Sequence, residues 1–343
     1  MRKFSSRLAI AADAAVILLL ASTWGMAQTP SSANSTNIVV YNAQHVNLTK
    51  AWAEGFTRQS GIKVTLRNGG DTELGNQIIQ EGAASPADVF LTENSPAMVL
   101  VDAAGRFAPL GDDVLMQVPD RFRPSDGRWV GVAARSTVFA YNKGKLTEAQ
   151  LPKSLLDLAD PAWKGRWGAS PSGADFQAIV SALLELKGEA VTEAWLKAMK
   201  QNAIAFRGNV AALKAVNTGE VDAAVIYHYY YFGDRARTGE NSNNTALYYF
   251  RNQDPGAFVS LSGGGVLAST KHLPQAQAFL KWITGKAGQE ILKKGDSFEY
   301  AVGVGAQSNP ALVPLADLQA PKVDPTRLNS KKVIDLMMQA GLM

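Results

Sequence analysis

The first part of the chain alternates strand and helix patterns, and this alternation constrains the fold more than any other feature. The predicted strands cover 37–42, 62–66 and 86–91, and helices are predicted between them over 47–60 and 72–82. A β-α-β-α-β order is typical of a parallel sheet that is covered by helices. We therefore expect an α/β protein with its ligand site at the carboxyl ends of the strands.

A chain of 343 residues is longer than one hydrophobic core usually serves, so we expect two lobes. Extended segments near 137 and 258 are suited to cross from the first lobe to the second and back. The predicted boundaries are 37–136 plus 258–311 for lobe 1, and 137–257 plus 312–343 for lobe 2. The prediction is thus a discontinuous first lobe, an inserted second lobe and a ligand cleft between them.

The N-terminus has the pattern of a cleavable secretory signal. Basic residues at Arg2, Lys3 and Arg7 precede a mostly apolar run, and small residues flank a cleavage position after Ala27. The apolar run is too short for a membrane anchor, and the chain has no cysteine to carry a lipid. We expect residues 1–27 to be removed and the mature protein to be a monomer, free in the periplasm rather than embedded in a membrane.

The composition excludes several classes of function. Removing residues 1–27 leaves 31 basic and 29 acidic residues, a net charge of +2, with no block of lysine or arginine. Nucleic acid is therefore not an expected partner. The absence of cysteine excludes disulfides, thiol catalysis and cysteine-ligated zinc. Any metal must be held by oxygen and nitrogen.

A tyrosine-rich run at 225–232 is the most unusual local feature. Four of the nine tyrosines and one of the three histidines fall within 227–231, after a segment that predicts a buried strand. Phenolates are hard anionic donors that suit hard cations, which makes a ferric-ion site one interpretation. The alternative is simple packing, because aromatic residues favour strands and bury large areas.

Two further candidates follow predicted strands of the first lobe. His45 comes after the first strand and Glu93 after the third, so both side chains could meet at one edge of a parallel sheet. Each has a plainer explanation, since an isolated histidine often caps a helix and Glu93 could mark a helix start. An imidazole, a carboxylate and two phenolates would together supply four donors from two lobes.

The segment Ser172-Gly173-Ala174 predicts a helix N-terminus, where free N–H groups could bind an anion. Capping by Ser172 is the plainer interpretation, and Asp175 in the first turn would compete with a bound anion. The run Gly263-Gly264-Gly265 lacks the spacing of a phosphate loop and predicts a bend between two strands.

Several motifs occur together in one order along the chain. They are VYNAQH (40–45), GIKV (61–64), PADVF (86–90), TE (92–93), WKG (163–165), NTGEV (217–221), YY (229–230) and QDPGA (253–257). With these motifs the chain resembles the periplasmic ferric-ion-binding proteins, which are solute-binding components of bacterial iron(III) ABC importers. The resemblance extends from about Asn37 to Leu342.

The resemblance implies a two-lobed periplasmic binding protein of type II, with a sheet flanked by helices in each lobe and a double-crossover hinge. It implies Fe(III) ligands at His45, Glu93, Tyr229 and Tyr230, and delivery to an inner-membrane ABC permease without catalysis. A synergistic anion, phosphate or carbonate, would complete the ligand shell, and its cradle corresponds to Ser172, Gly173, Ala174 and Asn209.

The chain departs from the family at Tyr227, where the resemblance implies an anion-contacting asparagine. Tyr227 could donate to the anion, replace it as an additional ligand, or only pack. A related binder of an organic or anionic solute, such as a phosphonate, thiamine or a polyamine, is the main alternative. A metal-assisted hydrolase is a further one, although no HExxH or GxSxG element is present.

Overall fold

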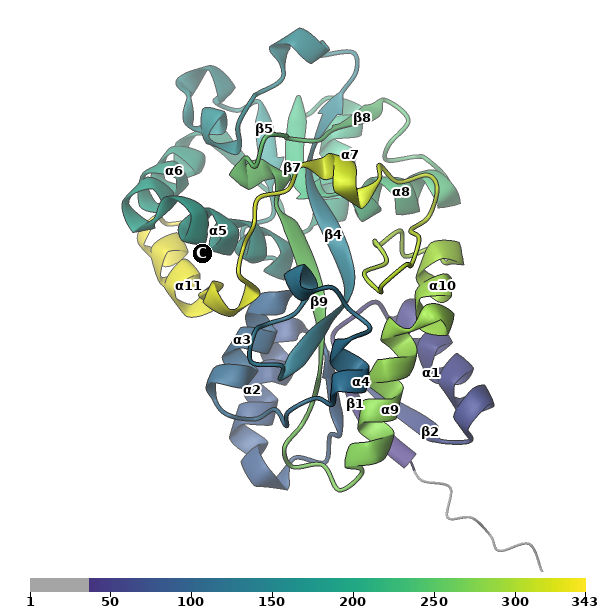
Figure 1. Cartoon of the computed structure of the whole chain (residues 1–343). Helices are drawn as coiled ribbons and strands as arrows, with labels where there is room; N and C mark the ends of the chain where they lie inside the picture. The colour runs from purple at the N-terminus through teal and green to yellow at the C-terminus, as the bar shows by residue number, and fades with distance from the viewer. Residues whose placement is uncertain (1–36) are drawn as a thin grey trace, which may run out of the picture. The chain divides into compact units, whose positions relative to one another are not determined.

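The computed structural model describes residues 37–343, and the predicted signal peptide lies outside this range. The strands are β1 (Asn37–Asn42), β2 (Lys63–Asn68), β3 (Val89–Leu91), β4 (Trp129–Asn142), β5 (Trp167–Ala169), β6 (Ala203–Ala205), β7 (Ala223–Tyr227), β8 (Thr245–Tyr248) and β9 (Val259–Val266). The α-helices are α1 (Val46–Ser60), α2 (Asp71–Glu81), α3 (Ser95–Ala103), α4 (Asp112–Leu115), α5 (Ala174–Lys187), α6 (Glu189–Asn202), α7 (Asn209–Thr218), α8 (His228–Arg237), α9 (Leu273–Thr284), α10 (Lys286–Lys294) and α11 (Ser330–Gln339). Helices lie on both sides of the central strands (Figure 1).

The strands follow the order β2-β1-β3-β9-β4-β7-β5-β6, and β8 pairs with β4. Strand β1 is parallel to both β2 and β3, as the alternating strand and helix patterns predict. In the other half, β5 is parallel to β6 and β7. The carboxyl ends of β1 and β3 therefore share one sheet edge, where polar side chains of the following loops can meet.

Strand β4 connects the two halves of the sheet. Its first part pairs with β9 as far as Ser136, and from Thr137 onward it pairs with β7. Figure 1 shows β4 and β9 running side by side through the middle of the chain. Residues on both sides of this change of partner are buried, so the extended segment predicted near 137 is part of one strand of 14 residues.

Two large hydrophobic clusters lie on either side of this connection. One contains Trp52 and Phe56 of α1 together with Phe279 of α9. The other contains Trp167 of β5 and Trp195 of α6. Trp52 and Trp167 are fully buried. Each half of the sheet thus has its own core, which allows each to hold one side of a site rigidly.

The glycine run was predicted as a bend, and this prediction is wrong. Gly263, Gly264 and Gly265 lie inside β9. An added Cβ at Gly263 would lie 2.2 Å from Met98 Cγ, and one at Gly265 would lie 2.5 Å from Phe107 Cε1. The glycines therefore serve close packing of neighbouring side chains against the strand rather than a change of direction.

The sequence of 154–163 predicts a helix that stops near Pro161, and the structure has helical turns of the 3-10 type there instead of an α-helix. Two short 3-10 helices, Leu155–Ala159 and Pro161–Trp163, occupy this segment. Asp160 precedes a proline, which disfavours the α conformation, and its carboxylate accepts the N–H of Ala162 at 2.8 Å. The break at Asp160 therefore has a local cause.

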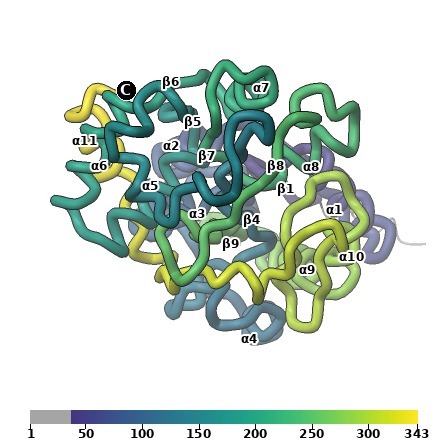
Figure 2. The backbone as a smooth tube through the Cα atoms, turned by 90° about the horizontal axis from the view of Figure 1, so that it is seen from above, coloured from purple at the N-terminus to yellow at the C-terminus, as the bar shows by residue number. Residues whose placement is uncertain are grey.

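The C-terminal segment ends in α11, which packs with the second half of the sheet. Val333, Leu336 and Met337 of α11 join the hydrophobic cluster that includes Trp195. Figure 2 shows the yellow end of the chain crossing from the side of α9 and α10 to that of α5 and α6. No helix within residues 37–343 has the length and apolar character needed to cross a membrane.

Candidate metal centre

His45 is held at the end of β1, directly before α1. Its backbone N–H donates to Gln44 Oε1 at 2.6 Å, and its carbonyl accepts the N–H of Thr49 at 3.0 Å. The imidazole is partly exposed, and its Nε2 lies 3.2 Å from Glu93 Oε1. The two strand-end side chains predicted to converge therefore do so.

The turn that carries Glu93 is fixed by Asp71, the first residue of α2. Asp71 Oδ1 accepts the backbone N–H of Glu93 at 2.8 Å, and Asp71 Oδ2 accepts that of Asn94 at 2.9 Å. The sequence reasoning missed this role of Asp71. An acidic residue at a helix start after Gly69-Gly70 is the signal that could have indicated it.

Tyr229 and Tyr230 lie in the first turn of α8, because β7 ends at Tyr227. The Tyr229 hydroxyl donates to Glu93 Oε1 at 2.6 Å, which joins the second half of the chain to the first. The ring centroids of Tyr229 and Tyr230 are 4.3 Å apart. Both phenols thus face the same group of polar atoms as His45 and Glu93.

Asp175 lies at the centre of this group, although the sequence reasoning considered it only as a competitor of a bound anion. Its Oδ2 accepts from Tyr229 OH at 3.1 Å, from Tyr230 OH at 2.9 Å and from Asn209 Nδ2 at 2.8 Å. Its Oδ1 accepts from Asn94 Nδ2 at 3.0 Å. A carboxylate of the chain therefore receives the donors that could otherwise bind a free anion.

The predicted anion cradle surrounds Asp175. Gly173 is the N-cap of α5, and Ser172 is exposed and makes no side-chain cap, so capping by Ser172 is wrong. Ala174 begins the helix directly before Asp175. Of the four predicted cradle residues, Asn209 is the one whose side chain reaches Asp175.

Tyr227 points between the two halves of the sheet. Its hydroxyl lies 3.4 Å from Asn94 Oδ1 and 3.3 Å from the backbone carbonyl of Asp175. The side chain is fully buried.

Its neighbour His228 is also fully buried, and His228 Nδ1 accepts the backbone N–H of Ser136 at 3.2 Å. Burial lowers the pKa of His228 to about 3, so this imidazole is neutral.

The carboxylates of the centre have shifted pKa values in opposite directions. Burial raises the pKa of Glu93, but the hydrogen bond from His45 and the charge of Arg135 outweigh burial and lower it to about 2. Burial, together with the nearby charge of Glu93, raises the pKa of Asp175 to about 6 and that of Asp71 to about 7. Glu93 is therefore the carboxylate that is ionised over the whole neutral range.

The phenols are strongly protonated in this environment. Burial and the charges of Asp175 and Glu93 raise the pKa values of Tyr229 and Tyr230 well above that of free tyrosine. A bound cation of high charge would reverse this effect, because it stabilises the phenolate form. Metal binding at these atoms would then release protons.

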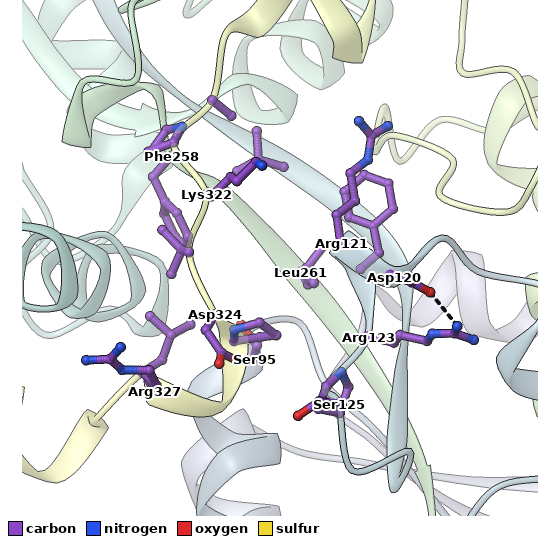
Figure 3. A pocket seen from close by; sticks show the side chains of 18 of the residues that line it. Ser95, Asp120, Arg121, Arg123, Ser125, Phe258, Leu261, Lys322, Asp324 and Arg327 are labelled. Atoms are coloured by element: carbon purple, nitrogen blue, oxygen red, sulfur yellow. Dashed lines mark hydrogen bonds and ion pairs between the residues drawn. The ribbon is translucent and has the colours of Figure 1, made fainter.

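No group of three or more histidine, aspartate or glutamate side chains within 37–343 is arranged as a metal site. The centre differs from such a group because two of its donors are phenols, which suit hard cations. A separate cavity of about 1020 Å³ is lined by residues of α4, β9 and 315–328. Figure 3 shows side chains that line it. It contains none of the predicted donors, and two of its arginines, Arg123 and Arg327, pair with Asp120 and Glu185.

Comparison with known proteins identifies the family of the chain. Residues 84–327 match the family model of bacterial extracellular solute-binding proteins. The chain is 70% identical over 328 residues to the Fe(3+)-binding periplasmic protein of Serratia marcescens, covering 95% of this chain and 97% of that protein. This chain belongs to the periplasmic ferric-ion-binding proteins. The family resemblance predicted from the sequence motifs is thus confirmed.

More distant relatives align with most of the chain. The major ferric iron-binding protein of Neisseria meningitidis serogroup B is 38% identical over 319 residues, with 92% of this chain and 95% of that protein covered. The crystal structure of iron-bound HitA from Pseudomonas aeruginosa has a TM-score of 0.84 and 41% identity, covering 90% of this chain and 100% of that one. The predicted two-lobed α/β fold is confirmed by this similarity.

Proposed function

We propose that this protein captures ferric iron between its two lobes in the periplasm and delivers it to the inner-membrane permease of an ABC importer. The observation that carries the proposal is the convergence of Tyr229 OH, His45 Nε2 and Glu93 Oε1 within hydrogen-bonding distance. Phenol, imidazole and carboxylate donors together suit a hard trivalent cation. The relatives named for ferric iron binding support the same cargo.

The proposed ligands are His45, Glu93, Tyr229 and Tyr230, with Asp175 as a further carboxylate ligand. Asp175 receives hydrogen bonds from both phenols, so a metal that displaces the phenol protons would meet its Oδ2 at the same point. A carboxylate in this place supplies the negative charge that a synergistic phosphate or carbonate would otherwise bring. We therefore infer that iron binding here does not require an added anion.

The lobes of the proposed receptor are 37–136 plus 258–311 and 137–257 plus 312–343. The pairing of β4 with β9 before Ser136 and with β7 after it supports this division. A monomer exported by a signal peptide over residues 1–27, acting without catalysis, completes the proposal. The cluster of carboxylates disfavours the alternative of an anionic solute, because like charges would face one another.

The test is a titration of the purified, iron-free mature protein with iron(III) chelated by nitrilotriacetate, followed by visible absorption and metal analysis. Phenolate ligands should produce a charge-transfer band that saturates at one iron per protein. The titration is done in buffer freed of phosphate and carbonate, so that a need for either of these two anions is detected. Absence of both the band and retained iron would contradict the proposal.

A further inference from the structure

Glu299 is a fully buried carboxylate next to the metal centre, outside the proposed ligand set. It lies in the chain after α10, and the adjacent Tyr300 forms an antiparallel bridge with Ala134 of β4. The N–H of Tyr300 donates to the carbonyl of Ala134 at 2.8 Å, and the N–H of Ala134 donates back at 3.0 Å. This pairing fixes the backbone at Glu299 relative to the strand that crosses between the lobes.

The two oxygens of Glu299 have different surroundings. Oε1 accepts from Arg135 Nη2, from Gln44 Nε2 at 3.2 Å and from Ser262 Oγ at 3.3 Å. Oε2 is buried and has no hydrogen-bond partner. It faces His45 Nδ1 at a distance of 3.6 Å. A buried carboxylate oxygen without a donor is costly, so its direction toward an imidazole needs an explanation.

His45 thus lies between two carboxylates, one at each ring nitrogen. Nε2 faces Glu93 and the phenol of Tyr229, whereas Nδ1 faces Glu299. A neutral imidazole carries a proton on one nitrogen and a lone pair on the other, and its surroundings decide which. A metal-binding histidine commonly donates its second ring N–H to a carboxylate, which sets the ring orientation and the tautomer.

We propose that Glu299 is a positioning residue for iron capture, and this inference rests on the proposed function. Glu299 Oε2 accepts the Nδ1–H of His45, so that the lone pair of Nε2 is directed at the metal. Arg135, which is fully buried, neutralises the carboxylate through Oε1 and leaves Oε2 for the imidazole. Glu299 itself does not touch the iron.

A simpler role for Glu299 would be that of counterion to Arg135. Oε1 alone fulfils that role, since the guanidinium bonds only to that oxygen. The counterion role therefore does not explain why Oε2 points at Nδ1. The two roles also predict different consequences when the carboxylate is changed to an amide.

The variant Glu299→Gln separates these roles. The guanidinium of Arg135 only donates, so the amide oxygen should stay on that side. The amide NH₂ would then face His45 Nδ1 and donate to it, which forces the imidazole proton onto Nε2. We expect iron affinity, measured by competition with nitrilotriacetate, to fall about 10-fold, at the lower end of the range typical of an outer-shell change.

The matched control is Glu290→Gln, which makes the same chemical change at a half-buried position of α10 where the carboxylate pairs with Lys294. Its iron affinity should equal that of the wild type. A double-mutant cycle with His45→Ala completes the design. If Glu299 acts through the imidazole, Glu299→Gln should have no further effect on iron affinity once the imidazole is removed.

A readout independent of iron is the tautomer of His45 in the iron-free protein, measured by long-range ¹H–¹⁵N NMR at neutral pH. We expect Nδ1 to carry a proton in the wild type, where Nε2 also faces a carboxylate, and to be unprotonated in Glu299→Gln. An unchanged tautomer, or an equal loss of affinity with and without His45, would overturn the inference. If the wild type itself fails to bind iron, the proposed function fails, while the NMR result still tests the contact between Glu299 and His45.

Discussion

The two sides of the candidate metal centre differ in their state of charge. On the side of β1 and β3, Glu93 is held ionised, since the hydrogen bond from His45 and the charge of Arg135 outweigh burial and lower its pKa. On the side of α5 and α8, burial raises the pKa values of Asp175, Tyr229 and Tyr230. The first side is therefore charged before a cation arrives, whereas the phenols of the second side become charged only when a cation displaces their protons. This contrast assigns affinity and pH dependence mainly to the second side.

The largest effect is expected from Tyr229→Phe, which removes a phenolate without changing the size of the ring. Iron affinity should fall more than about 100-fold, beyond the usual range for outer-shell changes, and most of the visible band should disappear. Tyr231→Phe, one position beyond Tyr230 in the same helix, is the matched control and should retain both. Competition with nitrilotriacetate and absorption spectroscopy measure the two quantities. An unchanged band in Tyr229→Phe would remove the second side from the site.

Asp175→Ala is expected to have the next largest effect. Removing the carboxylate leaves both phenol hydroxyls without their shared acceptor and should lower iron affinity about 100-fold in anion-free buffer. Adding phosphate or carbonate should restore part of the affinity, because an anion can then occupy the vacated place beside Asn209. The wild type should show no such gain. A wild-type protein that needs phosphate to bind iron would contradict the role given to Asp175.

His45→Ala is expected to lower iron affinity less than the two preceding variants. The imidazole is a neutral donor and is partly exposed, so its loss should lower affinity about 10- to 30-fold, at the lower end of the outer-shell range. The position of the charge-transfer band should hardly change, because both phenolates remain. The same spectra that test Tyr229→Phe check this result. A loss of the band equal to that of Tyr229→Phe would remove the distinction between the two sides.

The smallest effect concerns the stability of the iron-free protein as a function of pH. Asp71 and Asp175 have pKa values of about 7 and about 6, above the ordinary value of 3.8, so the folded state binds their protons more tightly than the unfolded state. Stability should thus rise by on the order of 1–3 kcal/mol as pH falls from 7.5 to 5. Glu93 has the opposite effect because its pKa is lowered in the folded state. Its contribution to the stability of the folded state is lost as pH falls from about 4.5 toward 2.

Thermal denaturation of the iron-free protein between pH 4 and 8 measures this profile. Asp175→Asn should reduce the slope between pH 5 and 7, because one of the two titrating carboxyl groups is gone while Asp71 remains. Iron affinity should change in the reverse sense and weaken in acid, since the phenols must lose their protons to bind. Iron-free stability that falls from pH 7.5 to 5 would contradict the raised pKa values of the second side.

Much of the fold follows from local patterns. The parallel arrangement of β1, β2 and β3 was predictable because each apolar strand is followed by an amphipathic helix with a defined end, such as Gly61 after α1. The position of the glycines inside β9 was not predictable. These glycines are needed because Met98 and Phe107, from distant parts of the chain, pack closely against the strand. A local pattern cannot reveal a neighbour that only packing brings near.

The same division holds within the metal centre. The sequence by itself determined the kinds of donor, the strand ends that carry His45 and Glu93, and the paired phenols of Tyr229 and Tyr230. Only the tertiary structure decided that Asp175 lies between the phenols and that Glu299 faces the imidazole. Asp175 and Tyr229, for example, are 54 residues apart in the sequence. The reason is physical: a carboxylate acquires its role from the charges and donors around it, and those are brought together by the packing of separate segments.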